Sequence, residues 1–386
     1  MNIKELDKKY VMGTYGRFPV TIVSGKGSLL YDDEGKEYID MGSGIAVNIF
    51  GAADDEWAKA VTAQLMQIQH TSNLYYTEPC AKLAQMICER SGMKKVFFCN
   101  SGAEANEGAI KAARRWSREK YGDGRYTIIT LRNSFHGRTI TTLAACGQDK
   151  LHTDFMPFTE GFVYADPTEL GSVKKLADEH NCCAIMLEVV QGEGGVNTLS
   201  PEFIDEIKTV AKEKDLLILV DEVQTGNGRT GQLYGFMNVG IQPDIFTTAK
   251  GLGDGLPIGA VVFSEKTENA LVPGTHGSTF GGNPVCAAGA CNVMERIDEE
   301  LLSGVRERSE YIINELKGAK GVKSVTGMGL MLGIDPEKPV ADIVAACREK
   351  GVLVLTAKTK VRLLPPLNIP MEQLKKAVAV IKEVLA

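Results

Sequence analysis

Between residues 95 and 263 the sequence alternates short apolar runs with amphipathic segments. The amphipathic segments carry apolar residues at helical spacing, as Ala105, Ala109 and Ala112 do. Strands that alternate with helices are typical of an α/β protein, in which helices cover both faces of a mostly parallel sheet. We therefore expect a seven-stranded sheet with one strand for each apolar run: Val96–Cys99, Thr127–Leu131, Phe162–Tyr164, Ala184–Val190, Leu216–Val220, Ile245–Thr248 and Ala260–Phe263.

The length of the chain indicates more than one domain. Its 386 residues exceed the roughly 250–300 residues at which one hydrophobic core usually stops growing. Residues 27–41 alternate around a turn at Glu34, which predicts a small hairpin. A first helix is expected after this hairpin, because apolar residues follow at helical spacing: Trp57, Val61, Leu65 and Ile68.

Beyond Pro284 the pattern predicts a long helix to about Lys317 and a last helix over Met371–Leu385. Short strands are expected between them, at Val322–Val325 and Leu330–Ile334. We predict that the N-terminal segment, 1–55, and the C-terminal part, 285–386, form a smaller α+β domain from both termini. The large domain is then 56–284.

Composition excludes several classes of protein. A formal net charge of −6 argues against binding to a nucleic-acid backbone, which needs a basic face. The first 20 residues contain no apolar signal region and no stretch is long enough for a membrane span, so a cytoplasmic protein is expected. Nine cysteines without a C-x-x-C pair and five scattered histidines predict neither disulfides nor a metal site.

Chemistry-bearing residues follow the predicted strands at the edge where parallel sheets bind ligands. Ser101-Gly102-Ala103 stands at a helix start, where backbone N–H groups and the helix dipole attract anions, although an ordinary helix cap looks the same. Asp221 ends a fully apolar strand, and a carboxylate there needs a cation or hydrogen-bond donors. A turn cap is an equal alternative at this position.

Lys250 follows the next apolar run and begins a glycine-rich loop. A desolvated lysine loses proton affinity and becomes a nucleophile toward carbonyl groups, whereas a solvated surface lysine is the common alternative. His276–Pro284 is a loop rich in hydroxyl groups and glycine, and it offers a second anion contact. An anion site, a buried carboxylate and a desolvated lysine together are what a phosphorylated pyridine aldehyde requires.

These motifs, in this order, resemble those of the class III aminotransferases, which are fold-type I pyridoxal-phosphate enzymes. Within that family they are most similar to the acetylornithine aminotransferases. The resemblance covers nearly the whole chain and is most specific over His70–Pro79, Phe97–Arg114, Ser134–Thr139, Leu219–Gly231, Ala249–Ala260 and Ser278–Pro284.

The resemblance implies pyridoxal 5'-phosphate as cofactor, with Lys250 as the catalytic lysine that carries it as a Schiff base. Asp221 would be the catalytic partner of the ring nitrogen and Gln224 the donor to the phenolic oxygen. Phe135 would stack on the pyridine ring. Ser101, Gly102 and Ala103 would bind the phosphate, and Thr279 would reach the phosphate of a second subunit, so a homodimer with shared active sites is implied.

The implied reaction moves the amino group of N2-acetylornithine to 2-oxoglutarate, giving N-acetylglutamate 5-semialdehyde and glutamate, a step of arginine biosynthesis. Arg138 resembles the clamp on the carboxylate of the donor, with Tyr15 and Ser278 as further substrate contacts. Arg362 resembles the clamp on the carboxylate of 2-oxoglutarate, and Glu193 the gate that neutralises Arg362 when a donor approaches.

The chain also departs from the family pattern. Residues 49–56 read IFGAADDE, without the usual Gly-His and His-Pro pairs, and Asn227 and Asp254 replace more usual residues. Gly44 stands where ornithine aminotransferases typically carry a bulky tyrosine, which leaves room for an acylated donor.

Other functions stay open at this point. An ornithine, succinylornithine, lysine or 4-aminobutyrate aminotransferase would share the cofactor motifs. An aminomutase or decarboxylating relative would not need the pair of Arg362 and Glu193. A non-catalytic protein of this fold would be expected to lose Lys250 or Asp221 first. A nicotinamide dehydrogenase is disfavoured, because the glycine fingerprint after the first strand is missing.

Overall fold

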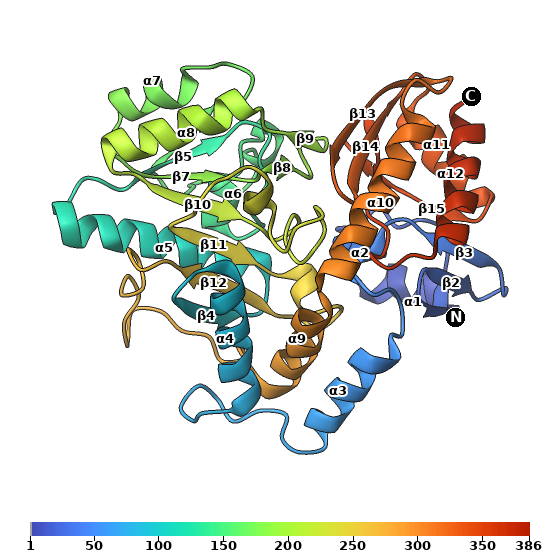
Figure 1. The fold of residues 1–386 in the computed structure, drawn as a ribbon, viewed down its shortest axis with the longest axis horizontal. Coiled ribbons are helices and arrows are strands. Elements are labelled where there is room, and N and C mark those ends of the chain that lie inside the picture. Colours follow the sequence, from blue (N-terminus) through green and yellow to red (C-terminus); the bar gives the residue numbers. More distant parts are fainter. Residues whose placement is uncertain (1) are drawn as a thin grey trace.

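The structure, a computed structural model, describes residues 2–386, and its centre is a seven-stranded sheet (Figure 1). Four neighbouring strand pairs are parallel, whereas β12 is antiparallel to both of its neighbours. The mostly parallel sheet predicted from the apolar runs is therefore confirmed. In spatial order its strands are β4 (Lys95–Cys99), β12 (Gly259–Phe263), β11 (Ile245–Thr248), β10 (Leu217–Asp221), β7 (Cys182–Leu187), β5 (Thr127–Leu131) and β6 (Phe162–Ala165).

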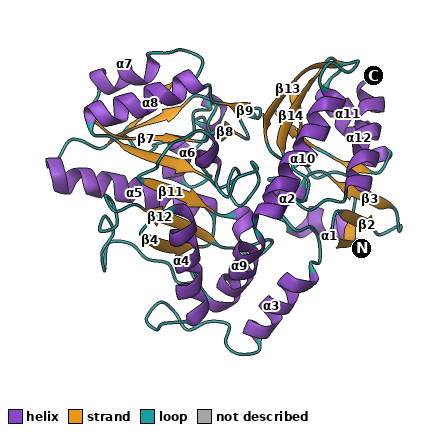
Figure 2. Cartoon of the chain, viewed as in Figure 1, coloured by secondary structure: helices purple, strands orange, loops and turns teal. Residues whose placement is uncertain are grey.

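Helices cover both faces of this sheet, as the purple and orange layers of Figure 2 show. Successive strand residues point to opposite faces, so Leu217 and Leu219 pack with the alanine-rich helix α5 (Gly102–Tyr121). Ile218 and Val220 belong to the core on the other face. The helices of that second core include α4 (Glu78–Ser91) and α8 (Pro201–Lys214); α7 (Ser172–Glu179) packs against α8, and α6 (Ile140–Ala145) against α5.

Segments from both ends of the chain share a second sheet. β1 (Ile22–Lys26), β2 (Leu29–Asp32) and β3 (Glu37–Asp40) form the predicted antiparallel hairpin with one more strand, and β3 pairs in parallel with β15 (Val352–Leu353). In Figure 1 the blue and red ends of the chain accordingly lie side by side. The predicted association of the two termini is thus present, while the exact domain boundaries stay a prediction.

The remaining C-terminal elements form a third sheet with helices packed on it. β14 (Met331–Pro336) lies between β13 (Val322–Met328) and β17 (Lys360–Leu363), and β16 (Leu355–Ala357) completes the sheet. The helices are α10 (Glu299–Leu316), α11 (Val340–Glu349) and α12 (Met371–Leu385), and the last of these begins and ends as predicted. The shorter elements are α1 (Ile3–Tyr10), α2 (Ser43–Ala46), β8 (Val190–Gln191) and β9 (Asn197–Thr198).

Two predicted helices differ from the observed ones. The long helix after Pro284 is divided into α9 (Pro284–Arg296) and α10, because Asp298 leaves the helical conformation and caps α10 by accepting the N–H of Leu301 at 2.8 Å. The helix predicted from Trp57 to Ile68 corresponds to α3 (Asp55–Leu65), which ends before Ile68. Within residues 2–386, no helix combines the length and apolar character that crossing a membrane requires.

Candidate active site

A cavity of about 420 Å³ lies at the carboxyl ends of the central strands and the start of α5. Residues from three separately predicted motifs meet in it, as expected for the edge of a parallel sheet. Both Lys250 and Asp221 line this cavity. Its wall also contains Ser101, Gly102, Ala103, Phe135, Arg138 and Gln224, together with Val47 and the loop Gly255–Ile258.

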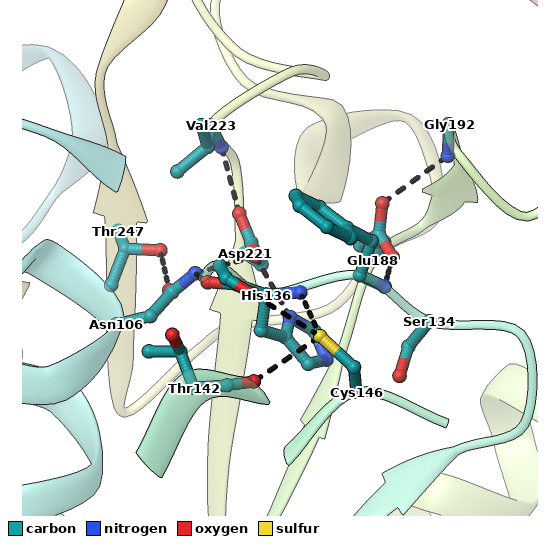
Figure 3. Close-up of polar contacts among 12 residues, drawn as sticks. Asn106, Ser134, His136, Thr142, Cys146, Glu188, Gly192, Asp221, Val223 and Thr247 are labelled. Carbon is teal, nitrogen blue, oxygen red and sulfur yellow. Dashed lines mark hydrogen bonds and ion pairs between the residues drawn. The ribbon is translucent and has the colours of Figure 1, made fainter. Parts of the chain in front are cut away.

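The Asp221 carboxylate at the end of β10 is buried, with 4% of its surface exposed, and is fixed by three contacts (Figure 3). Oδ2 accepts a hydrogen bond from Nδ2 of Asn106 at 2.8 Å and lies 2.8 Å from Nδ1 of His136. Oδ1 accepts the N–H of Val223 at 3.0 Å. The hydroxyl of Thr247 in turn donates to Asn106 at 2.7 Å and so fixes the orientation of its amide. These contacts meet the cost of burying the charge and hold the carboxylate in one position.

Glu188, just after β7, is a second buried carboxylate beside this group. It accepts a hydrogen bond from the N–H of Phe135 at 2.9 Å. Figure 3 shows its second hydrogen bond, from the N–H of Gly192 at 3.2 Å. Burial raises the pKa of Glu188 to about 7, the nearby His136 opposes this shift, and Asp221 adds to it. Glu188 therefore ties the backbone of Phe135 to the sheet.

The start of α5 has the features of an anion site. The hydroxyl of Ser101 caps the helix by accepting the N–H of Glu104 at 3.2 Å. The first-turn N–H groups of a helix have no partner within it and, with the helix dipole, favour a negative ligand. Gly102 is required there, because a Cβ would lie 2.6 Å from Cγ1 of Val223.

Lys250 follows β11 with a left-handed backbone, at φ +47°. Burial lowers the pKa of its amine, while the charges of Glu193 and Asp221 oppose the shift. A lowered pKa increases the fraction of neutral amine, which is the nucleophilic form. Lys250 is thus suited to react with a carbonyl group in the cavity.

Arg362 comes from β17 of the third sheet and reaches the edge of the same site. It is 3% exposed, and its Nη1 lies 2.5 Å from Oε1 of Glu193 and 3.3 Å from Oε1 of Gln224. Burial alone would raise the pKa of Glu193, but the charge and hydrogen bond of Arg362 outweigh it and the pKa is lowered. The predicted pair of Arg362 and Glu193 is therefore an ion pair beside a cavity residue.

The other predicted substrate and cofactor residues lie at different distances from this cavity. Arg138 lines it, with its guanidinium 5.2 Å from the ring centroid of Phe135. Ser278 accepts the Nδ2 of Asn100, a cavity residue, at 3.2 Å. Tyr15 is 74% exposed, and Thr279 lines a separate cavity of about 260 Å³. Within residues 2–386 of one chain, neither Tyr15 nor Thr279 lines the Lys250 cavity.

Sequence reasoning missed three residues that shape the site: Asn106, His136 and Glu188. Asn106 stands one helical turn after Gly102, so it faces the same side of α5. Glu188 interrupts an otherwise apolar run, which is a signal that it needs partners. His136 had no such signal, because an isolated histidine is compatible with many structural positions.

The matching family model is described as aminotransferase class-III and spans residues 10–385 of the chain. The chain is a class III aminotransferase. The family resemblance and the fold predicted from the motifs are thereby confirmed. As an aminotransferase it moves an amino group between two small molecules.

Named relatives agree with this family. The aminotransferase is 48% identical to the acetylornithine aminotransferase of Haemophilus ducreyi, over 100% of this chain and 98% of the relative. It is 44% identical to that of Caldanaerobacter subterraneus, over 98% of each chain. Among solved structures, the N-acetylornithine aminotransferase of Stenotrophomonas maltophilia is 31% identical with a TM-score of 0.82, over 98% of this chain and 97% of the other.

An enzyme with another donor in its name has a higher TM-score to this chain. The ornithine aminotransferase of Toxoplasma gondii is 30% identical with a TM-score of 0.94, over 99% of this chain and 94% of the other. A second structure of that enzyme is described with partial occupancy of PLP at the active site. The fold is therefore shared by enzymes that carry different substrate names.

Proposed function

We propose that this aminotransferase uses pyridoxal 5'-phosphate, held in the Lys250 cavity. The residues present fit that group, because an anion-binding helix start, a buried carboxylate and a lysine of lowered pKa line one cavity. Ser101, Gly102 and Ala103 would hold the phosphate. Asp221 would face the ring nitrogen and Phe135 the ring.

Pyridoxal phosphate, when bound, supplies an aldehyde and an electron-accepting ring for amino-group transfer. The negative charge of Asp221 favours a proton on a ring nitrogen that faces it. Gln224 would donate to the phenolic oxygen. The amine of Lys250 holds and returns a proton as general base and acid, and burial, which lowers its pKa, favours the neutral form that acts as the base.

We further propose that N2-acetylornithine is the amino donor and 2-oxoglutarate the acceptor, in a step of arginine biosynthesis. The identity of 48% over the full length of a relative named acetylornithine aminotransferase carries this proposal. Arg138 at the cavity supports it, because a planar guanidinium binds a carboxylate through two hydrogen bonds. Gly44 supports it as well, because a Cβ at this position would contact Val47, a residue that lines the cavity, at 3.8 Å, and glycine leaves that space free.

The ion pair of Arg362 and Glu193 would allow one site to accept two different substrates. In the structure Glu193 neutralises Arg362, which suits a donor whose reacting end carries an amine and no adjacent carboxylate. An acceptor with a carboxylate next to its reacting carbon replaces Glu193 on Arg362. The products are N-acetylglutamate 5-semialdehyde from the first half-reaction and glutamate from the second.

A panel of single-turnover half-reactions tests the donor. Acetylornithine, ornithine, succinylornithine and 4-aminobutyrate are mixed separately with the cofactor-loaded enzyme, and the spectral change of the cofactor is followed. We expect the second-order rate constant for acetylornithine to be at least about tenfold higher than the rate constants for the other donors. A factor of about ten is the lower end of the discrimination that contacts in a binding pocket provide. A preference for ornithine or 4-aminobutyrate would replace the proposed donor.

A further inference from the structure

Three departures from the family pattern meet around Lys250 in the folded chain. They are the segment Ile49–Glu56 and the single residues Asn227 and Asp254. They are widely separated in the sequence, yet each contacts the strand end or the loop that carries Lys250.

The backbone at Lys250 needs support from its surroundings. Its φ of +47° lies in the left-handed region, which residues with a Cβ adopt only where neighbouring structure enforces it. The loop itself is a tight turn, in which Leu252 donates to the carbonyl of Ala249 and Gly253 to that of Lys250, both at 3.0 Å. Any shift of this turn moves the amine relative to the cavity.

Asn227 holds the chain just before Lys250. Its side chain is buried, and its Nδ2 donates to the hydroxyl of Thr248 at 3.0 Å and to the carbonyl of Ala249 at 3.2 Å. Asn227 itself has a φ of +56°, a conformation that asparagine tolerates better than most residues. The last residues of the strand are thereby fixed from one side.

Asp254 holds the chain just after Lys250. It is 6% exposed, and its carboxylate accepts the N–H of Phe50 at 3.3 Å. Burial raises the pKa of Asp254 to about 7, against the N–H groups of Phe50 and Ile49, which lower it. The loop Gly255–Ile258 that follows lines the cavity, so this contact fixes a cavity wall as well.

The segment that contacts Asp254 is held in place by further contacts. The ring of Phe50 lies 3.8 Å from the guanidinium of Arg296 on α9, and the same guanidinium binds both carboxylate oxygens of Asp54, at 2.6 and 2.9 Å. Asp54 also caps α3, which packs along α9 in Figure 1. A Cβ on Gly251 would lie 2.8 Å from Cγ2 of Ile49, so this segment also presses directly on the residue after Lys250.

We infer that Asn227 and Asp254 are positioning residues that hold the backbone of Lys250 from both sides, Asn227 through Ala249 and Asp254 through Phe50. Neither side chain lines the Lys250 cavity. The inference rests on the catalytic role proposed for Lys250.

Glycine substitutions test this inference without adding backbone strain. Asn227→Gly and Asp254→Gly remove the side chains at positions with positive φ, where glycine is unstrained. Ala53→Gly is the matched control, because Ala53 has a φ of +50° in the same segment and no polar side chain. Asp254→Asn keeps an acceptor oxygen and tests rescue by the conservative variant.

Each full-length variant is measured in three ways. Steady-state kinetics with acetylornithine and 2-oxoglutarate give kcat and KM. Thermal unfolding gives the stability. The pH dependence of Lys250 modification by trinitrobenzenesulfonate, followed by peptide mass spectrometry on cofactor-free enzyme, reports how buried the amine is.

Asn227→Gly and Asp254→Gly are expected to unfold within about 4 °C of the wild type. Their kcat falls by about tenfold to a hundredfold, since misplacement by about 1 Å can cost a hundredfold. Their Lys250 reacts only at higher pH, because a less buried amine regains its proton affinity. Ala53→Gly and Asp254→Asn stay close to the wild type in all three measurements.

Two results would overturn the inference. One is a folded glycine variant whose kcat and Lys250 labelling match the wild type. The other is a loss of kcat that accompanies a large loss of stability with unchanged labelling. A wild type that transaminates no donor would instead refute the proposed function, and the labelling curves would still decide whether Asn227 and Asp254 position Lys250.

Discussion

Asp221 shows which part of the site a sequence can predict at the scale of single residues. A carboxylate at the end of an apolar strand needs hydrogen-bond donors or a cation, so the sequence alone marks Asp221 as a candidate site residue. Its actual partners did not, because Asn106 is 115 residues away along the chain and His136 is 85 residues away. Only the parallel sheet brings these side chains together.

Arg362→Ala tests the gate formed by Arg362 and Glu193. Each charge-assisted hydrogen bond contributes about 1.5–3 kcal/mol, and about 1.4 kcal/mol is tenfold in rate, so we expect kcat/KM for 2-oxoglutarate to fall by on the order of a hundredfold. The donor half-reaction, measured separately, should change much less. Equal losses in both half-reactions would contradict the assigned role of Arg362.

At the scale of elements, apolar runs predict strands better than helical periodicity predicts helix ends. β5 and β11 begin and end where the sequence predicts. Their residues are almost all buried, and the polar ones are threonines, which favour strands. The break between α9 and α10 was missed, since apolar spacing continues across it. The signal was Asp298 followed by Glu299 and Glu300, an N-cap with acidic residues in the first turn.

One prediction at the scale of elements concerns the start of α5. In Gly102→Ala the new methyl group would meet Val223, so the first turn must shift and anion binding weakens. We expect a lower affinity for pyridoxal phosphate, measured by equilibrium titration of cofactor-free enzyme. The double variant Gly102→Ala with Val223→Ala should regain most of the affinity. Unchanged affinity in Gly102→Ala would contradict an anion site at this helix start.

The whole molecule exposes an apolar surface next to the cavity that contains Thr279. Tyr75 and Tyr76 line that cavity and are 71% and 106% exposed, and Leu74 beside them is 86% exposed. Large exposed apolar patches mark interaction surfaces. A second copy of the chain on this surface would also explain why Thr279 lies outside the Lys250 cavity.

Light scattering tests this assembly. We expect about twice the chain mass of 41.8 kDa, and loss of both the dimer and the activity in the double variant Leu74→Asp with Tyr76→Asp. The exposed pair Lys174 and Asp178 on α7 provides a control, since Lys174→Asp alters a charged surface far from this patch in sequence. A fully active monomer would contradict the shared active site.

The proposed amino-group transfer depends on Lys250 being the residue that reacts with the cofactor. The direct test is to load the enzyme with pyridoxal phosphate, treat it with borohydride and map the modified peptide by mass spectrometry. We predict a visible absorption band that borohydride bleaches, with the cofactor then attached irreversibly to Lys250 and absent from Lys250→Ala. A colourless protein, or a cofactor attached to another lysine, would contradict the central claim.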